Sequence, residues 1–249
     1  MTDAIVKKIP NRNPSWDEDA ERMLLFADFM GFKNRVYTKD HATLKNELEQ
    51  FHCKFIKKLS PLMKGEHLKS SQFSDSILIV VNGTNDKMFN LITKAAVCLV
   101  QISMENGIPI KGAIAQGIFT FDEKKQLFFG KPLIEAYLLE EESKYYGITV
   151  HHSAEKTIRL YNSSANPYSN TVVPLEKGEV CHYHLCWNLI SPQLFPKDNT
   201  EQCLTWLDEI SLSVSGQPRI YVDKTKKVLK QDQDLFQKER EQNNEETRK

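Results

Sequence analysis

Met23-Leu24-Leu25-Phe26-Ala27-Asp28-Phe29-Met30-Gly31-Phe32 is a run of apolar residues with a single carboxylate, Asp28, set inside it. Its length and composition predict a buried strand. A carboxylate in such a run loses several kcal/mol of hydration unless a positive group meets it, or unless it ends the strand and caps the next turn. A glycine at position 31 allows backbone N–H groups to turn inward around an anion, which favours a functional role for Asp28.

A second acid, Asp75, stands in a similar setting. The segment Gln72-Phe73-Ser74-Asp75-Ser76-Ile77-Leu78-Ile79 leads into a run of β-branched residues, and residues 72–81 are predicted to form a strand that ends at the turn signal Asn82-Gly83. A lone acid at the start of a strand is more often a turn residue that is exposed to solvent. Two such acids on neighbouring elements could instead bind two divalent cations that hold a triphosphate and polarise an attacking hydroxyl.

Strands and helices are predicted to alternate around these two acids. Apolar residues three and four apart indicate helices, and β-branched or small apolar runs bounded by glycine indicate strands. Helices are predicted over residues 40–63, 86–106 and 133–143, and strands over 23–32, 72–81, 108–121, 127–129 and 148–151. Gly112 and Gly117 mark points of close packing in one of these strands. The order is that of an α+β, ferredoxin-like core elaborated with a hairpin.

The rest of the chain is predicted to surround this core. We expect an N-terminal leader over residues 1–21, the core over 22–151, an extension packed on the core over 152–223, and a charged tail over 224–249. Within the extension, Val180–Leu189 and Arg219–Val222 have strand composition. The tail is almost wholly polar, which favours a frayed helix or a flexible segment.

Composition narrows the classes of protein to consider. Among 249 residues, the charges balance to a formal net charge of zero, so no global basic field indicates a nucleic-acid partner. No run of about 18 apolar residues occurs, and the N-terminus lacks the apolar centre of a secretory signal, so we expect neither a membrane span nor export. The five scattered cysteines argue against a disulfide framework and favour the cytoplasm.

Four motifs, taken in order, resemble a known family. FADFMGF is similar to the FAD-[ILV]-x-GF segment of class III adenylyl and guanylyl cyclases, and FSDSILI to the hairpin that carries their second metal-binding aspartate. IKGAIAQG resembles their RxGIxxG strand, and GKPLIEAYLLE falls where their last catalytic helix begins. The resemblance covers roughly Leu24 to Val150. The sequences of these motifs are most similar to those of the compact bacterial pyrimidine cyclases of anti-phage defence.

The resemblance implies an activity and a set of site residues. A class III cyclase converts a nucleoside triphosphate to a 3′,5′-cyclic mononucleotide and pyrophosphate with two Mg²⁺ or Mn²⁺ ions, in a head-to-tail homodimer with sites at the interface. In the defence branch the substrate is UTP or CTP, and the product activates a separate effector protein. The implied metal ligands are Asp28, Asp75 and the Phe29 carbonyl; the implied phosphate-binding groups are the amides of Met30, Gly31 and Phe32 and the side chains of Lys33 and Arg35. Lys111 takes the place of the family's strand arginine and is expected to be structural.

The sequence departs from the family where an asparagine and an arginine are expected on the last helix. Ile134 and Leu138 occupy those positions, and neither can orient a ribose or stabilise phosphate charge. Ser71 and Leu127 replace the two purine-selecting residues, which fits a pyrimidine substrate without showing one. Either other groups compensate, with Lys33, Arg35, Glu135 and Tyr137 as candidates, or the domain has lost turnover.

Two further hypotheses therefore stay open. The chain could be a catalytically degenerate cyclase-fold module that binds nucleotide or dimerises. It could also be a palm-type polymerase such as a diguanylate cyclase, although Ser74-Asp75-Ser76 stands where the GG[DE]EF hairpin would be.

A third cluster of chemical interest lies in the extension. On a strand, His182, His184 and Cys186 would share one face and could supply three zinc ligands. No fourth ligand follows at a usual spacing, and the paired CxxC arrangement is absent, so an ordinary structural strand is the favoured interpretation.

Overall fold

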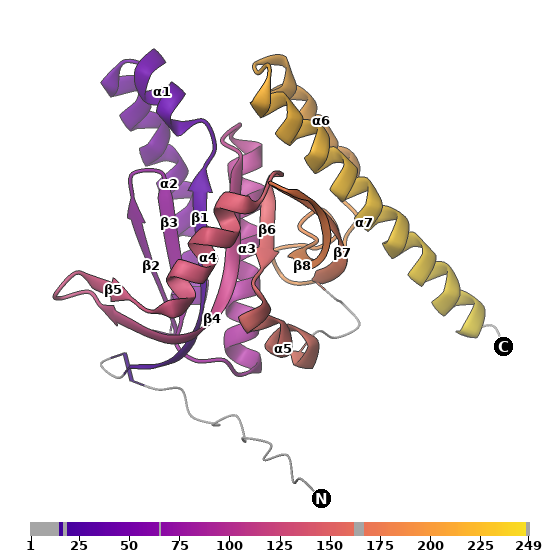
Figure 1. Cartoon of the computed structure of the whole chain (residues 1–249), viewed down its shortest axis with the longest axis horizontal. Helices are drawn as coiled ribbons and strands as arrows, with labels where there is room; N and C mark the ends of the chain where they lie inside the picture. The colour runs from indigo at the N-terminus through magenta and orange to yellow at the C-terminus, as the bar shows by residue number, and fades with distance from the viewer. Residues whose placement is uncertain (1–14, 17–18, 65, 162–166, 248–249) are drawn as a thin grey trace, which may run out of the picture.

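The fold is built around β1 (Ala20–Phe29), which lies at the centre of one eight-stranded sheet (Figure 1). This computed structural model describes residues 15–247, apart from 17–18, 65 and 162–166. Most of the predicted leader therefore lies outside the described residues. The other elements are α1 (Phe32–Thr38), α2 (His41–Met63), β2 (Leu68–Phe73), β3 (Ser76–Val81), α3 (Asp86–Glu105), β4 (Ile110–Asp122), β5 (Leu127–Phe129), α4 (Lys131–Glu142), β6 (Gly147–Val150), α5 (His152–Tyr161), β7 (Tyr168–Leu175), β8 (Gly178–Leu185), α6 (Thr200–Leu212) and α7 (Gln217–Thr247).

The sheet combines antiparallel and parallel pairing. Its strand order is β2-β3-β1-β4-β6-β8-β7, and β5 pairs with β4 off this path. β1 runs antiparallel to both of its neighbours, β3 and β4, whereas β4 and β6 are parallel. The predicted α+β class and the order of the core elements are confirmed.

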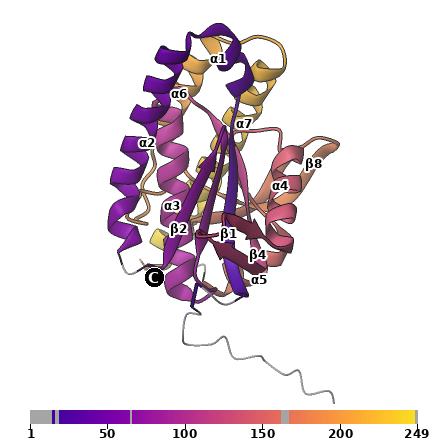
Figure 2. The same ribbon diagram turned by 90° about the vertical axis from the view of Figure 1, so that its left-hand side faces the viewer.

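Alternation along β1 buries both faces of the sheet. Met23 and Leu25 face a large apolar cluster with α2 and α3, whereas Leu24 and Phe26 face a smaller cluster that includes Ala136 of α4. Figure 2 shows α2 and α3 on one side of the sheet and α4 on the other. Since side chains alternate with a period of two, Asp28 follows Leu24 and Phe26 onto the α4 face.

The helix α3 is the core helix of the larger cluster. By length and composition it could cross a membrane, contrary to the sequence expectation that no segment would, but 72% of the relevant window is buried inside the fold. Thirteen of its residues are buried, and it contacts β1, β3, β4 and β6. Its apolar character is therefore explained by packing in the protein core.

Gly112 and Gly117 lie where the sequence predicts close packing in β4. A Cβ at Gly112 would stand 2.6 Å from the Phe26 carbonyl oxygen and 2.9 Å from Ile148 Cδ1. A Cβ at Gly117 would stand 3.2 Å from Pro132 Cδ, at the start of α4. These glycines let β4 approach its neighbours and seat α4 on the sheet.

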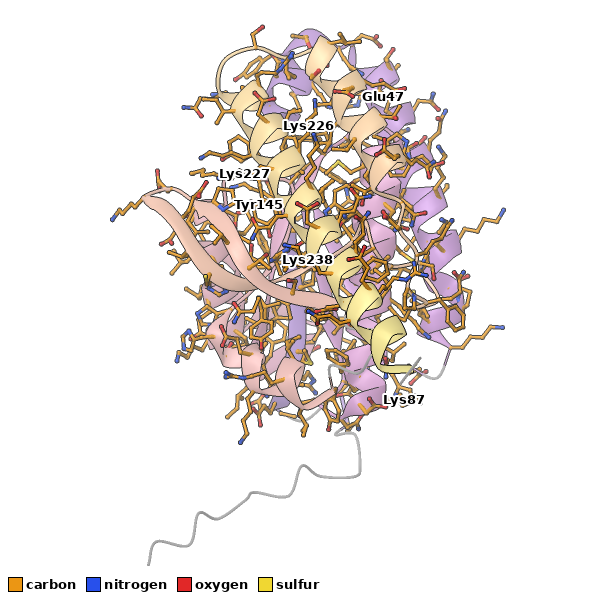
Figure 3. All side chains as sticks on the ribbon, turned by 90° about the vertical axis from the view of Figure 1, so that its right-hand side faces the viewer. Glu47, Lys87, Tyr145, Lys226, Lys227 and Lys238 are labelled. Carbon is orange, nitrogen blue, oxygen red and sulfur yellow. The ribbon has the colours of Figure 1, made fainter. Side chains whose placement is uncertain are left out.

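The C-terminal region differs most from the sequence prediction. Arg219–Val222, predicted as a strand, belongs to α7, and the predicted boundary between extension and tail falls inside the same helix. Figure 3 shows α7 running beside the β7–β8 hairpin, where Tyr145 packs with Val173 of β7 and Val228 of α7. β7 and β8 continue the core sheet through β6, so residues 168–185 extend the core directly.

Candidate active site

A row of three polar side chains crosses the sheet at the end of β1. Asp28 is paired in register with Ser76 of β3 and with Lys111 of β4. The two preceding rows on this face, Phe26 with Leu78 and Ala113 and Leu24 with Val80 and Ala115, are apolar. The hydroxyl of Ser76 donates a hydrogen bond to Asp28 Oδ1 at 3.1 Å. The polar row therefore begins where the apolar packing under α4 ends.

Asp75 lies in the tight turn between β2 and β3. The structure shows that residues 72–81, predicted as one strand, form a hairpin with Ser74 and Asp75 at its tip. Ser74 adopts a positive φ of 54°, and the Asp75 carbonyl accepts a hydrogen bond of 3.0 Å from the Phe29 amide. That bond holds the hairpin tip against the end of β1, which brings the second acid close to Asp28.

Gly31 makes the turn from β1 into α1. Its φ of +76° lies in the left-handed region, where glycine is favoured because it has no Cβ. The Met30 amide donates to the Pro109 carbonyl at 2.8 Å and is therefore committed to the fold. Of the three amides predicted to contact phosphate, Gly31 and Phe32 remain candidates, and Met30 contributes to the shape of the turn.

Arg35 points away from the two acids. Its guanidinium donates to the Gly107 carbonyl and lies 3.4 Å from Glu47 Oε2. It lines a separate cavity of about 520 Å³ between α1 and the α6–α7 hairpin. The structure thus assigns Arg35 to packing of α1 against the fold, and a triphosphate beside Asp28 would not meet it.

The helix α4 brings a further acid, Glu140, over the polar row. Glu140 is 3% exposed, and its Oε1 lies 3.1 Å from Lys111 Nζ, which also donates a hydrogen bond of 2.9 Å to the Glu140 carbonyl. Burial raises the pKa of Glu140 to about 7, although Lys111 opposes this shift. The sequence did not single out Glu140, because its place depends on how α4 lies across β4.

These residues line one pocket with a volume of about 410 Å³. Its carboxylates are Asp28, Asp75, Glu140 and Glu141, and its cations are Lys33 and Lys111; the other lining residues are Phe26, Phe29, Met30, Gly31, Phe32, Ser76 and Tyr137. Burial raises the pKa of Asp28, and the negative charge of Asp75 raises it further, against the opposing effects of Ser76 and Lys111. Acids outnumber bases here, and a pocket of that kind attracts cations.

The pocket therefore brings together Asp28, Asp75, Phe29, Met30, Gly31, Phe32 and Lys33 from the predicted site, and leaves out Arg35. Of the candidate substitutes on α4, Tyr137 lines the pocket with its ring against Phe26, and its hydroxyl donates to Glu141. Glu135 instead forms an ion pair with Lys131, and its Oε2 lies 3.5 Å from His151 Nδ1. Ile134 and Leu138 are 59% and 52% exposed on the surface of α4.

Solved structures with the same arrangement of elements are nucleotide cyclase domains. The adenylyl cyclase CyaB from P. aeruginosa superposes with a TM-score of 0.50 at 14% identity, over 66% of this chain and 93% of the other. The guanylyl cyclase domain of the RhoGC fusion protein from the aquatic fungus Blastocladiella emersonii, described as a non-canonical dimer, superposes with a TM-score of 0.52 at 13% identity, over 66% of this chain and 93% of the other. The chain has the class III cyclase fold.

A third cyclase-fold structure was solved with a nucleotide analogue. It is the catalytic core of a rhodopsin-guanylyl cyclase with converted specificity in complex with ATPαS, which superposes with a TM-score of 0.50 at 15% identity over 66% of this chain and 94% of the other. No family model and no curated protein sequence matches the chain. At these identities the likeness establishes the cyclase fold alone, and activity has to be argued from the pocket.

Proposed function

We propose that this chain is a metal-dependent nucleotidyl cyclase, which converts a nucleoside triphosphate to a 3′,5′-cyclic mononucleotide and pyrophosphate. The observation that carries the proposal is the placement of Asp28 and Asp75, from two elements 47 positions apart in the chain, in one pocket of a cyclase fold. Both acids lie beside a glycine turn that can admit phosphate groups.

The chemistry of the pocket fits divalent cations. Burial raises the pKa of Asp28 and the negative charge of Asp75 raises it further, while Lys111 already shares its charge with Glu140. Oxygen ligands of this kind suit Mg²⁺ or Mn²⁺, and Asp28, Asp75 and the Phe29 carbonyl are the groups that would hold them. When bound, such cations activate a hydroxyl nucleophile and neutralise a triphosphate.

The remaining residues of the pocket bind and orient the substrate in this proposal. Lys33 and the amides of Gly31 and Phe32 meet the β- and γ-phosphates, while the ribose 3′-hydroxyl attacks the α-phosphate and pyrophosphate leaves. This reaction depends mainly on positioning and charge stabilisation. Glu140 is a positioning residue because it holds Lys111 in the row beside Asp28.

We further propose UTP or CTP as the substrate and a cyclic pyrimidine nucleotide as the product, which would act on a separate effector protein in antiviral defence. The support is indirect: Ser71 and Leu127 stand where the resemblance places purine-selecting groups, and neither lines the pocket among the described residues. All five cysteines are unpaired, in keeping with a proposed cytoplasmic location.

A head-to-tail homodimer with interface active sites is part of the proposal. Ile134 and Leu138 of α4, Ile118 of β4, and Leu127 and Phe129 of β5 are all at least 46% exposed. β5 pairs with β4 and α4 packs on β4, so these apolar side chains come from adjoining elements. A second copy of the chain would cover such a surface and remove it from water.

The competing candidate is a degenerate cyclase fold that binds nucleotide without turnover. It is favoured by the exposed hydrocarbon side chains of Ile134 and Leu138, at the positions where the family carries asparagine and arginine. Under the catalytic proposal, Tyr137 takes the role of the missing asparagine or arginine, because it also lies on α4 and lines the pocket around Asp28.

The deciding experiment incubates the purified chain with Mn²⁺ and each of the four ribonucleoside triphosphates and searches for cyclic product by mass spectrometry. We expect product from UTP or CTP, and a loss of at least about a hundredfold in Asp28→Asn and Asp75→Asn. Asp234→Asn, an exposed acid on α7, is the matched control and should leave the rate unchanged. Nucleotide binding without product from any substrate would establish the degenerate alternative.

A further inference from the structure

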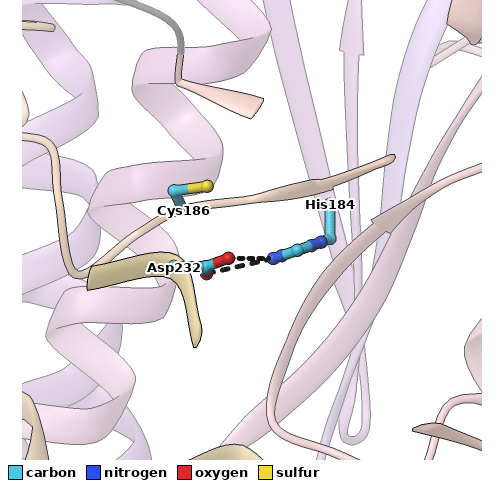
Figure 4. A group of neighbouring side chains, drawn as sticks. All are labelled: His184, Cys186 and Asp232. Atoms are coloured by element: carbon cyan, nitrogen blue, oxygen red, sulfur yellow. Dashed lines mark hydrogen bonds and ion pairs between the residues drawn. The ribbon is translucent and has the colours of Figure 1, made fainter. Parts of the chain in front are cut away.

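A second group of chemically reactive side chains is buried where α7 meets the sheet. His184 lies near the end of β8 and Cys186 follows two positions later, while Asp232 comes from α7 (Figure 4). Their side chains converge although 46 residues separate Cys186 from Asp232 along the chain. None of the three belongs to the pocket around Asp28.

The geometry of the group is compact and closed to solvent. His184 Nε2 lies 3.0 Å from both carboxylate oxygens of Asp232, and one ligand atom from each of the three residues lies within 4.8 Å of the others. His184, Cys186 and Asp232 are each at most 3% exposed. Both carboxylate oxygens thus face the imidazole, and the thiol lies within 4.8 Å of the same group.

The set of donor atoms is one nitrogen, one sulfur and two oxygens. Imidazole, thiolate and carboxylate are the three side-chain ligands that Zn²⁺ uses, and a bidentate carboxylate completes four donor atoms. With Cys186 and Asp232 ionised and His184 neutral, a Zn²⁺ complex has no net charge, so burial carries little Born penalty. Softer ligands such as a thiolate select zinc over Mg²⁺ or Mn²⁺.

The sequence pattern suggested a different trio, with His182 in place of Asp232. In the structure His182 is half-buried, lies opposite Thr171 in the β7–β8 pairing, and is absent from the group that converges on Cys186. The residues near His184 and Cys186 in the sequence offered no complete set of ligands. Asp232 of α7 completes the set, from a segment that has no metal-binding pattern of its own.

We propose that His184, Cys186 and Asp232 bind one Zn²⁺ ion, which fastens α7 to the β7–β8 end of the sheet. Binding displaces the thiol proton of Cys186, which leaves to solvent as the site forms during folding. His184 stays neutral: its one proton lies on Nδ1, 3.4 Å from the His182 carbonyl oxygen, and Nε2 meets the metal. The alternative is a hydrogen-bonded cluster without metal, in which Asp232 accepts bonds from His184 and from Thr171.

The first test measures zinc in the purified full-length chain by inductively coupled plasma mass spectrometry. The chain is refolded with Zn²⁺ and then dialysed against EDTA, which removes metal from the open, oxygen-lined pocket. We expect about one zinc per chain to remain, because a buried site exchanges slowly. Less than about a tenth of an equivalent in the folded wild type would overturn the proposal.

The second test replaces Zn²⁺ with Co²⁺ during refolding and records the visible spectrum, where a thiolate ligand produces a charge-transfer band. No cysteine lines the pocket around Asp28, so the thiolate band reports on Cys186 even if that pocket also binds Co²⁺. Cys186→Ser should abolish the band, and Cys181→Ser, a change at an exposed cysteine on β8, should retain it. Folded wild type that binds Co²⁺ without a thiolate band would contradict the site.

Discussion

Asp28 and Asp232 are both acids set against apolar packing, and their surroundings differ in one respect that explains their roles. Asp232 is 2% exposed and lies 3.0 Å from His184, so its charge has a dedicated partner. Asp28 is half-buried, shares Lys111 with Glu140, and faces a second acid in Asp75. The closed cluster is a buried set of donor atoms that suits a structural ion, whereas the open pocket keeps an excess of acid that an exchangeable cation can neutralise.

The largest expected effect follows from neutralising each acid in turn in protein that has been refolded without metal. Asp232→Asn should lower the free energy of unfolding by about 3 to 5 kcal/mol, because it leaves His184 buried without its charged partner. Asp28→Asn should raise the free energy of unfolding at pH 8, because it removes a carboxylate that burial and Asp75 disfavour. Urea denaturation measures both, and equal losses in the two variants would contradict the comparison.

Glu140 should make stability depend on pH in a known direction. Its pKa is raised from 4.5 to about 7, so the folded state binds a proton more tightly than the unfolded state. Stability is therefore lost as pH rises from about 4.5 through 7, by up to about 3 kcal/mol. Glu140→Gln should flatten this slope in EDTA, and Glu142→Gln, an exposed neighbour, should not. An unchanged slope in Glu140→Gln would assign the pH dependence to another group.

Gly112 lies between the two regions. It follows Lys111 of the pocket along β4, and it is paired with Ile148 of β6, the strand next to β8 and its His184. Gly112→Ala would force a Cβ to 2.6 Å from the Phe26 carbonyl oxygen, and we expect a loss of about 1 to 3 kcal/mol on thermal or urea unfolding. Gly117→Ala, with its nearest contact at 3.2 Å, should cost less. The reverse order would mean that β4 moves apart from β1 more easily than from α4.

The smallest effect on stability is expected at the exposed surface of α4. Leu138→Glu should change the free energy of unfolding by no more than about 0.5 kcal/mol, because the side chain is 52% exposed. It should nevertheless shift a dimer to a monomer in analytical ultracentrifugation if α4 lies in the interface. Leu160→Glu, at an exposed position on α5, is the control. A dimer that persists in Leu138→Glu would place the interface elsewhere.

The core fold was accessible from sequence because its signals are local. Apolar strands interrupted by single acids, helices with Asp40 and Asn85 at their N-caps, and glycines at close contacts each depend on a few neighbouring residues. The two central acids stood out for the same reason. Their proximity depends on the hairpin turn at Asp75, which residue composition over 72–81 did not indicate and the family resemblance did.

The C-terminal helix was predicted only in part, as a frayed helix or flexible segment from residue 224, because its buried seam is partly polar. Val222, Thr225, Val228, Leu229 and Asp232 are buried at helical spacing, but Thr225 and Asp232 interrupt the apolar pattern. Each polar member has a distant partner: the Thr225 hydroxyl accepts from the Tyr146 amide, and Asp232 meets His184. Glu140 escaped the sequence for this reason, and so did Asp232 as the partner of His184 and Cys186, since the partners lie on different elements.

The central claim is that Asp28 and Asp75 bind a divalent cation, and Mn²⁺ titration tests it most directly. The signal of free Mn²⁺ in electron paramagnetic resonance reports binding without nucleotide or turnover. Refolding with Zn²⁺ fills the His184 cluster, and dialysis against EDTA and then against buffer clears the pocket around Asp28 before the titration. We expect wild type and Asp234→Asn to bind Mn²⁺ alike, and Asp75→Asn to bind at least about tenfold more weakly. Equal affinity in wild type, Asp28→Asn and Asp75→Asn would contradict the account.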